Sequence, residues 1–170
     1  CSYALNTASA SHGSAATSGS FGVTAQAGCG WSATTSQTWI HTTSSGTGNG
    51  TVSYTVDANG GTSSRTGTIA VGGQSFTVNQ AGITCSYALN TPSASHGSAA
   101  GSGSFGVTAQ AGCAWSAATT FAWIHTTSSG TGNGTVSYTV DANVSTSSRS
   151  GTITVDGQSF TVSQAGVPCS

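Results

Sequence analysis

Methionine, lysine and glutamate are absent from this chain of 170 residues, and charged residues make up only 3% of it. Ordinary globular domains carry roughly 25% charged residues, so this surface is expected to be hydrated by serine and threonine hydroxyls instead. The sequence contains no basic patch, which excludes nucleic acid as an expected partner. The apolar runs are far shorter than the ~20 residues of a spanning helix, so we expect no membrane insertion. The chain also lacks an initiator methionine and a visible signal peptide, which indicates a processed or excerpted piece.

The scarcity of acidic residues argues against an enzyme. A glycosidase needs two carboxyl groups across one sugar bond, and the carboxylates here are only Asp57, Asp141 and Asp156. The four histidines stand in no cysteine or aspartate motif and are interpreted as surface or strand-end residues: His12, His41, His96 and His125. No close Cys or His pairs exist, so we expect no metal site, no cofactor and no catalytic residues.

The two arginines have a structural interpretation. We expect Arg65 and Arg149 to pair with Asp57 and Asp141 of their own halves, or to cap backbone carbonyls.

A tandem repeat organises the whole chain. Residues 1–84 align with residues 85–168 without a gap, and 69 of the 84 positions are identical. Cys169 and Ser170 repeat the opening Cys-Ser on the same period. The sequence therefore predicts one repeat at 1–84, a second at 85–168, and the start of a third at 169–170, as in a longer tandem array.

Each repeat is typical of an all-β domain. The stretch TVSYTVD alternates apolar and polar residues with the period of a half-buried strand. The stretch RTGTIAVGGQSFTVNQ predicts a hairpin, and the Asp156-Gly157 version of its turn suits type I′. Strands are expected at residues 2–5, 20–26, 31–35, 51–57, 65–71 and 74–79. This count in ~84 residues favours two tandem Ig-like β-sandwich domains.

The cysteines stand 28 residues apart in each repeat. We expect one intradomain disulfide per repeat, Cys1–Cys29 and Cys85–Cys113, with the partner of Cys169 outside this chain. A bridge Cys29–Cys85, which would join the two repeats, remains an alternative. Disulfides indicate an oxidising, extracellular setting, and each is expected to contribute roughly 3–4 kcal/mol to a small domain.

A family resemblance rests on motifs that occur in the same order in both repeats. These are CSYAL, GCGW or GCAW, TWIH or AWIH, SGTGNGTVSYTVDAN, SSRTGTI or SSRSGTI, and QSFTVNQAG or QSFTVSQAG. The pattern resembles the BACON domain family from end to end of each repeat. The resemblance implies an Ig-like sandwich of bacterial secreted or surface proteins, often in tandem, that acts as a carbohydrate- or mucin-binding module or as a spacer.

The tryptophans are the candidate sugar-binding residues. Trp31 and Trp115 follow a predicted disulfide cysteine and are expected in the core. If Ile40 and Ile124 point inward, strand alternation turns their neighbours outward, where Trp39 and Trp123 would stack on a sugar ring. If this segment is irregular, both tryptophans are buried instead.

The features of the chain as a whole favour a structural role. The join at residues 80–84 is too short to act as a flexible tether, so we expect consecutive domains to stack at a fairly fixed twist. Few charges leave little to oppose association between copies of the chain. We therefore predict a non-catalytic segment of an extracellular fibre, filament or stalk on a bacterial surface, whose partners are copies of itself. The alternative is a carbohydrate- or mucin-binding module with repeated weak sites.

Glycosylation is a further hypothesis, in which the chain is part of an adhesin stem. Three asparagines match the Asn-x-Ser/Thr pattern: Asn49, Asn133 and Asn143.

Overall fold

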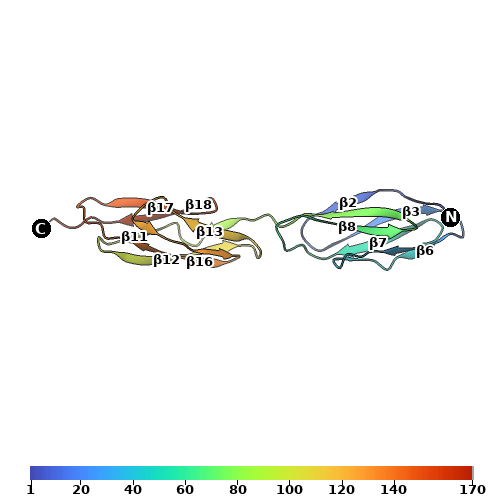
Figure 1. The fold of residues 1–170 in the computed structure, drawn as a ribbon, viewed down its shortest axis with the longest axis horizontal. Helices are drawn as coiled ribbons and strands as arrows, with labels where there is room; N and C mark the ends of the chain where they lie inside the picture. The colour runs from blue at the N-terminus through green and yellow to red at the C-terminus, as the bar shows by residue number, and fades with distance from the viewer. Residues whose placement is uncertain (170) are drawn as a thin grey trace. The chain divides into compact units, whose positions relative to one another are not determined.

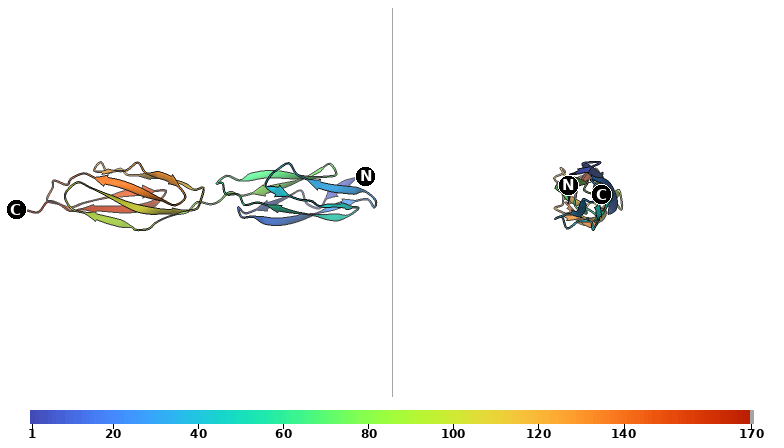
Figure 2. Two further views of the ribbon diagram at one scale, coloured as in Figure 1. Left: turned by 90° about the horizontal axis from the view of Figure 1, so that it is seen from below. Right: turned by 90° about the vertical axis from the view of Figure 1, so that its right-hand side faces the viewer.

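The computed structural model describes residues 1–169, which form strands and contain no helix that could cross a membrane. It divides into two compact units, Cys1–Thr84 (unit 1) and Cys85–Ser170 (unit 2). In each unit two sheets pack face to face (Figure 1, Figure 2). The predicted third repeat stays a prediction, because Ser170 lies outside the described residues.

In unit 1 a four-stranded sheet faces a five-stranded sheet. The first sheet has the order β1 (Tyr3–Leu5), β3 (Thr17–Ala25), β7 (Gly50–Val56), β5 (Ile40–His41). The second has the order β2 (Ser9–His12), β9 (Gln74–Gln80), β8 (Arg65–Val71), β4 (Gly30–Thr34), β6 (Ser45–Thr47). The strands at the sheet edges are short, which limits pairing with another chain.

Unit 2 repeats this topology. Its first sheet has the order β10 (Tyr87–Leu89), β12 (Gly101–Ala109), β16 (Gly134–Val140), β14 (Ile124–His125). Its second has the order β11 (Ser93–His96), β18 (Gln158–Gln164), β17 (Arg149–Val155), β13 (Ala114–Ala118), β15 (Ser129–Thr131). The predicted fold class, two tandem Ig-like β-sandwich domains with one disulfide each, is confirmed.

The core of each unit follows from strand alternation. Val52, Tyr54 and Val56 of β7 are buried, whereas the residues between them are exposed, as the period of two predicts. The rings of Phe21 on β3 and Phe76 on β9 stack at 4.0 Å between the two sheets. Such a stacked pair stabilises the fold by about 1 kcal/mol beyond the stabilisation from buried apolar area.

The predicted hairpin between the last two strands of each unit is present. Gly72 and Gly73 both have positive φ, 56° and 82°, and join β8 to β9 with Val71 opposite Gln74. In unit 2 the same turn is made by Asp156 and Gly157, at 42° and 89°. Two positive φ angles are the signature of the type I′ turn, which only glycine, asparagine and aspartate adopt readily.

Within each unit the chain enters and leaves at opposite ends of the strands. Tyr3 pairs with Ala25 and its ring packs on Gly72, so the N-terminal segment lies at the end that holds the β8–β9 turn. Gln80 pairs with Arg65 at the other end, seven residues or ~20 Å along the strands. We call these the entry end and the exit end. In unit 1 the short strand β2 near the start of the chain pairs in parallel with β9, the last strand of the unit.

Candidate functional site

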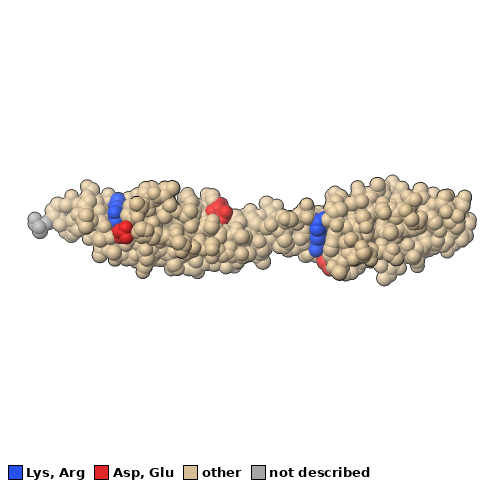
Figure 3. Space-filling view, in the orientation of Figure 1, with Lys and Arg blue, Asp and Glu red and all other residues tan. Residues whose placement is uncertain are grey.

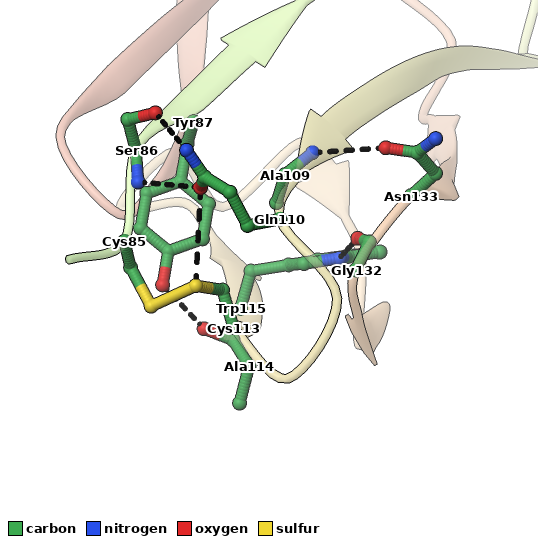
Figure 4. The surroundings of a disulfide bond; sticks show 10 residues. All are labelled: Cys85, Ser86, Tyr87, Ala109, Gln110, Cys113, Ala114, Trp115, Gly132 and Asn133. Atoms are coloured by element: carbon green, nitrogen blue, oxygen red, sulfur yellow. Dashed lines mark hydrogen bonds between the residues drawn. A yellow bond between two sulfur atoms is a disulfide. The ribbon is translucent and has the colours of Figure 1, made fainter. Parts of the chain in front are cut away.

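The disulfides lie at the entry end of each unit and have the predicted pairing, Cys1–Cys29 and Cys85–Cys113. The pairing of Cys29 with Cys85 is therefore excluded. Around the second bridge, the Gln110 side chain accepts a hydrogen bond from the Ser86 backbone N–H at 2.9 Å and donates one to the Ser86 hydroxyl at 2.8 Å (Figure 4). Cys169 is exposed and forms no disulfide within the chain, so its predicted partner stays a prediction.

The first tryptophan of each unit belongs to the core, as predicted. Trp31 is 7% exposed, and its indole N–H donates to the Gly48 carbonyl at 2.9 Å. Gly50 lies flat against the indole, where a side chain would overlap the ring. Between these glycines, the Asn49 side chain accepts from the Ala25 backbone N–H at 3.0 Å. The Gly-Asn-Gly motif therefore forms the surface on which Trp31 packs. Figure 4 shows the equivalent contacts of Trp115 with Gly132 and of Asn133 with Ala109.

The second tryptophan, the candidate for sugar stacking, is half-buried against the core. Ile40 points inward as expected and is 2% exposed, but Trp39 precedes this strand in a turn, where alternation does not apply. The Arg65 guanidinium covers its ring at 4.3 Å from the centroid, and Arg149 covers Trp123 at the same distance. Such a cation–π contact contributes roughly 0.5–2 kcal/mol. One face of each indole is therefore already occupied by the protein.

A polar network at the exit end holds this arginine in place. Arg65 Nε donates to Gln80 Oε1 at 2.9 Å, and Nη2 donates to the backbone carbonyl of Asp57 at 2.6 Å. Gln80 is 1% exposed, and its Nε2 donates to the carbonyls of Asp57 at 3.0 Å and Ala15 at 3.2 Å. Of the two interpretations of the arginines, carbonyl capping is thus the one found. Figure 3 shows how few charged side chains interrupt the uncharged surface.

The remaining motif residues close the loops at the same end. Asn59 is 7% exposed and donates its two amide hydrogens to the carbonyls of Ser63 at 2.9 Å and Ala81 at 3.1 Å. Gly82 passes so close to the Thr62 carbonyl that a Cβ atom would overlap it. The Gln-Ala-Gly, Asn and Arg-x-Gly motifs therefore serve the fold, because all of these side chains are used within their own unit.

The three predicted glycosylation sites differ in accessibility. Asn49 and Asn133 are exposed, and each uses its Oδ1 to accept a backbone hydrogen bond. Asn143 is 4% exposed and donates both amide hydrogens to the carbonyls of Ser147 and Ala165. The geometry of the folded unit thus favours Asn49 and Asn133 and disfavours Asn143 as an acceptor.

A shallow groove lies on the outer face of the first sheet of unit 1, and sequence reasoning missed it. It is lined by residues of β3, β5, β7 and the loop that follows β5: Ser18, Gly19, Ser20, His41, Thr42, Thr43, Ser53, Tyr54 and Thr55. The equivalent nine residues of unit 2 form a second groove: Ser102, Gly103, Ser104, His125, Thr126, Thr127, Ser137, Tyr138 and Thr139. We call these the hydroxyl grooves.

Each hydroxyl groove contains a histidine with an acidic partner. His41 Nε2 lies 3.0 Å from Asp57 Oδ2, and His125 Nε2 lies 3.1 Å from Asp141 Oδ1; both pairs are more than half exposed. The pairing arises because β5 and β7 are neighbours, with His41 opposite Thr55. Sixteen residues separate the partners, so no local motif marks the pairing. The prediction of surface or strand-end histidines is confirmed for His41 and His125, which are exposed and end β5 and β14.

The chemistry available in the hydroxyl groove is hydrogen bonding. Among the described residues, His41 Nε2 bonds to Asp57, and no serine or threonine hydroxyl bonds to this histidine. Within residues 1–169 no three His, Cys, Asp or Glu side chains gather in a way that would hold a metal ion. Beneath the groove, burial raises the pKa of the Tyr54 phenol, whose hydroxyl bonds to His12 Nε2 at 2.9 Å.

Among the comparisons with known proteins, a family model matches once in each unit. The model of the BACON family, described as "Putative binding domain, N-terminal", matches residues 30–81 and 114–165, together more than half of the chain. A crystal structure of a tandem segment of titin is similar to the chain at 8% identity with a TM-score of 0.36. That alignment covers 98% of this chain and 66% of the titin chain, a likeness too weak to carry an argument. No curated protein matches the chain.

Proposed function

This chain belongs to the BACON family, and on that premise we propose that it is a non-catalytic structural segment of a bacterial extracellular fibre, filament or stalk. The observation that carries the proposal is the junction between the units. The Ile83 backbone N–H donates to the Gly61 carbonyl within unit 1 at 2.9 Å, whereas Cys85 is bridged to Cys113 within unit 2. Thr84 alone lies between these two attachments, so the chain has no length with which to form a flexible tether.

The end of unit 2 has the same design. The Val167 backbone N–H donates to the Ser145 carbonyl at 2.8 Å, and Pro168 follows directly. Proline fixes its own φ and restricts the residue before it, which stiffens the segment further. A short, stiff segment after each unit suits a spacer that must hold its domains at a constant distance.

The short edge strands favour a fibre made by covalent repetition over one made by edge-to-edge pairing. The four edge strands of unit 1 contain between two and four residues each. At β7, the Ser44 hydroxyl accepts from the Ser53 N–H at 2.9 Å and donates to the Ser53 carbonyl at 3.1 Å, which occupies that edge. Copies of the chain therefore have little free edge to share, although β1 covers only the last three residues of β3.

Small-angle X-ray scattering tests the proposed junction. The wild type is expected to scatter as a particle with one fixed distance between unit centres. Insertion of four Gly-Ser residues after Ile83 should broaden this distribution, whereas the same insertion in the exposed β8–β9 turn should not. Equal distributions for the wild type and the junction insertion would remove the support for a spacer.

Electron microscopy of secreted material tests the fibre itself. Uniform beaded threads would support the fibre, and discrete ovoid particles would contradict it.

The hydroxyl groove supports a second candidate function, a carbohydrate- or mucin-binding module acting through repeated weak sites. Its lining of hydroxyls and one imidazole can donate to and accept from sugar hydroxyls, and it occurs at the same place in both units. A glycan array tests it with the double variant His41→Ala/His125→Ala. Binding that this variant abolishes would favour the module, and a wild type that binds no glycan would exclude it. The stacking role of Trp39 and Trp123 stays a proposal, tested on the same array by Trp39→Ala and Trp123→Ala variants, which should abolish glycan binding.

A further inference from the structure

Each disulfide has a mechanical consequence if the chain bears tension, and the inference that follows rests on the structural role proposed above. We infer that the bridge passes the covalent tension around the first three strands of its unit, so that the chain between the two bridged cysteines is not stretched and stays looped when the unit is pulled open. The chain would then be a tandem of force-bearing domains in which every unit has a limited extension.

The covalent path of the load in unit 2 supports this inference. Tension that arrives through Thr84 reaches Cys85 at once, because Ile83 is still attached to unit 1. From Cys85 two covalent paths lead onward: the bridge to Cys113, and the 28 residues of chain that contain β10, β11 and β12. The two Cα atoms of the bridge are only 5.6 Å apart, whereas the chain path is many times longer. The shorter path takes the tension. The longer path, which we call the slack branch, is not stretched.

The loaded strands lie in the second sheet and along the direction of the pull. Cys113 leads directly into β13, and the load leaves through the end of β18, with β17 between them in the same sheet. Because the entry and exit ends are opposite, the force runs parallel to the strands. Hydrogen bonds between antiparallel strands are perpendicular to the strands, so such a force shears the two paired positions of β13 with β17 and the seven paired positions of β17 with β18. The parallel partner β11 is held on the slack branch and supports β18 from the other side.

The same path exists in unit 1, where the bridge Cys1–Cys29 also spans 28 residues and joins Cα atoms 5.6 Å apart. Cys29 precedes β4, and β9 leads out through Ala81, whose backbone N–H donates to the His12 carbonyl at 3.0 Å. The carbonyl that receives this bond ends β2, which lies on the slack branch. Two units with equal bridges predict two equal unfolding events.

Single-molecule force spectroscopy of the whole chain, in a Cys169→Ser background to prevent thiol exchange, measures the length of the slack branch. With both bridges intact, each unfolding step should release ~100 Å less chain than after reduction, because 28 residues are withheld at up to ~3.6 Å each. The bridged Cα atoms are close together, so the folded distance between the loaded points hardly changes. Equal step lengths before and after reduction would overturn the inference.

A variant of one unit provides a matched comparison inside a single molecule. Cys1→Ser with Cys29→Ser should give one long step for unit 1 and one short step for unit 2. If unit 1 of this variant does not fold, the oxidised wild type still decides, since steps that release the full length of each unit would refute the slack branch. Step lengths do not depend on what the protein does in its host, so absence of fibres would overturn the proposed function and leave this measurement standing.

Discussion

Replacement of Gln80 by methionine is expected to destabilise unit 1 by about 3 kcal/mol and to leave unit 2 unchanged. Methionine has a similar volume but neither donates nor accepts a strong hydrogen bond. The change removes the acceptor of Arg65 Nε and the donor to the Ala15 carbonyl, whose only described partner is Gln80. A polar group that is shielded from water and left without a partner costs ~1–3 kcal/mol, and more when it is charged. Most of the loss therefore comes from the half-buried, charged Arg65, because Ala15 is exposed. The Asp57 carbonyl keeps its bond from Arg65 Nη2 and adds little to the loss.

Differential scanning calorimetry can resolve this effect because the chain contains its own reference. The two units are so similar that the wild type should show overlapping transitions. A loss of 3 kcal/mol lowers the midpoint of a domain of this size by ~15 °C, so the variant should show one transition near the wild-type temperature and one far below it.

Matched variants exclude other causes of the split. Gln164→Met should move the transition of unit 2 by the same amount. Gln74→Met, on the same strand but exposed, should move neither transition by more than ~3 °C. If Gln80→Met and Gln74→Met behave alike, the network at the exit end does not stabilise the unit as described, and the reasoning from unsatisfied groups fails.

Three further predictions concern the rest of the fold. Gly82→Ala should destabilise unit 1 by roughly 1–3 kcal/mol in urea denaturation, because the added Cβ meets a backbone carbonyl that cannot move aside; a neutral result would contradict the close approach. Burial raises the pKa of Tyr54 and of Tyr138, so their contribution to stability is complete below the pKa of an unfolded tyrosine, ~10, and is lost as the pH rises above it. Denaturation at pH 8 and pH 11 in a Cys169→Ser background should show this loss, and the Tyr→Phe variants should reduce it. Reduction of the bridges should lower the stability of each unit by about 3–4 kcal/mol at neutral pH, and a smaller change than 1 kcal/mol would mean that the reduced chain keeps much of its order.

The long strands could be predicted from the sequence because their patterns are local. β7, β8 and β9 alternate over seven residues each, and the predicted ranges agree with the structure to within one residue. β2, β5 and β6 were missed, since they contain two to four residues and no alternating apolar pattern. β2 reads Ser-Ala-Ser-His and becomes a strand only because it pairs with β9, almost seventy positions away. Such a pairing is a property of the tertiary structure and leaves no local signal.

The candidate site was harder to predict for the same reason. The Cys-x-Trp spacing predicted a buried Trp31 correctly, because a neighbouring bridge fixes the segment. For Trp39 the sequence left two alternatives, an outward position on a regular strand and a buried position in an irregular segment. The structure has a turn there, and an arginine from a distant strand covers the half-buried ring. The partner of His41 is likewise brought close by sheet formation alone. Contacts between segments, and not residue types, decided where each of these side chains lies.

The two hydroxyl grooves have identical linings, but the two units as a whole are also nearly identical in sequence. All nine lining positions are the same in both units, although most of their side chains are exposed and do not pack in the core. Since 69 of 84 positions are identical overall, nine unchanged positions would arise without selection about one time in six. The identity of the grooves is therefore weak support for a ligand. For the motif residues, by contrast, a contact within the same unit explains why each residue type is needed. A structural segment requires only those contacts within each unit. A binding module requires in addition that the groove binds a ligand, which its identity in the two units does not establish. The groove variants and the junction insertion are therefore the two experiments that separate the proposals.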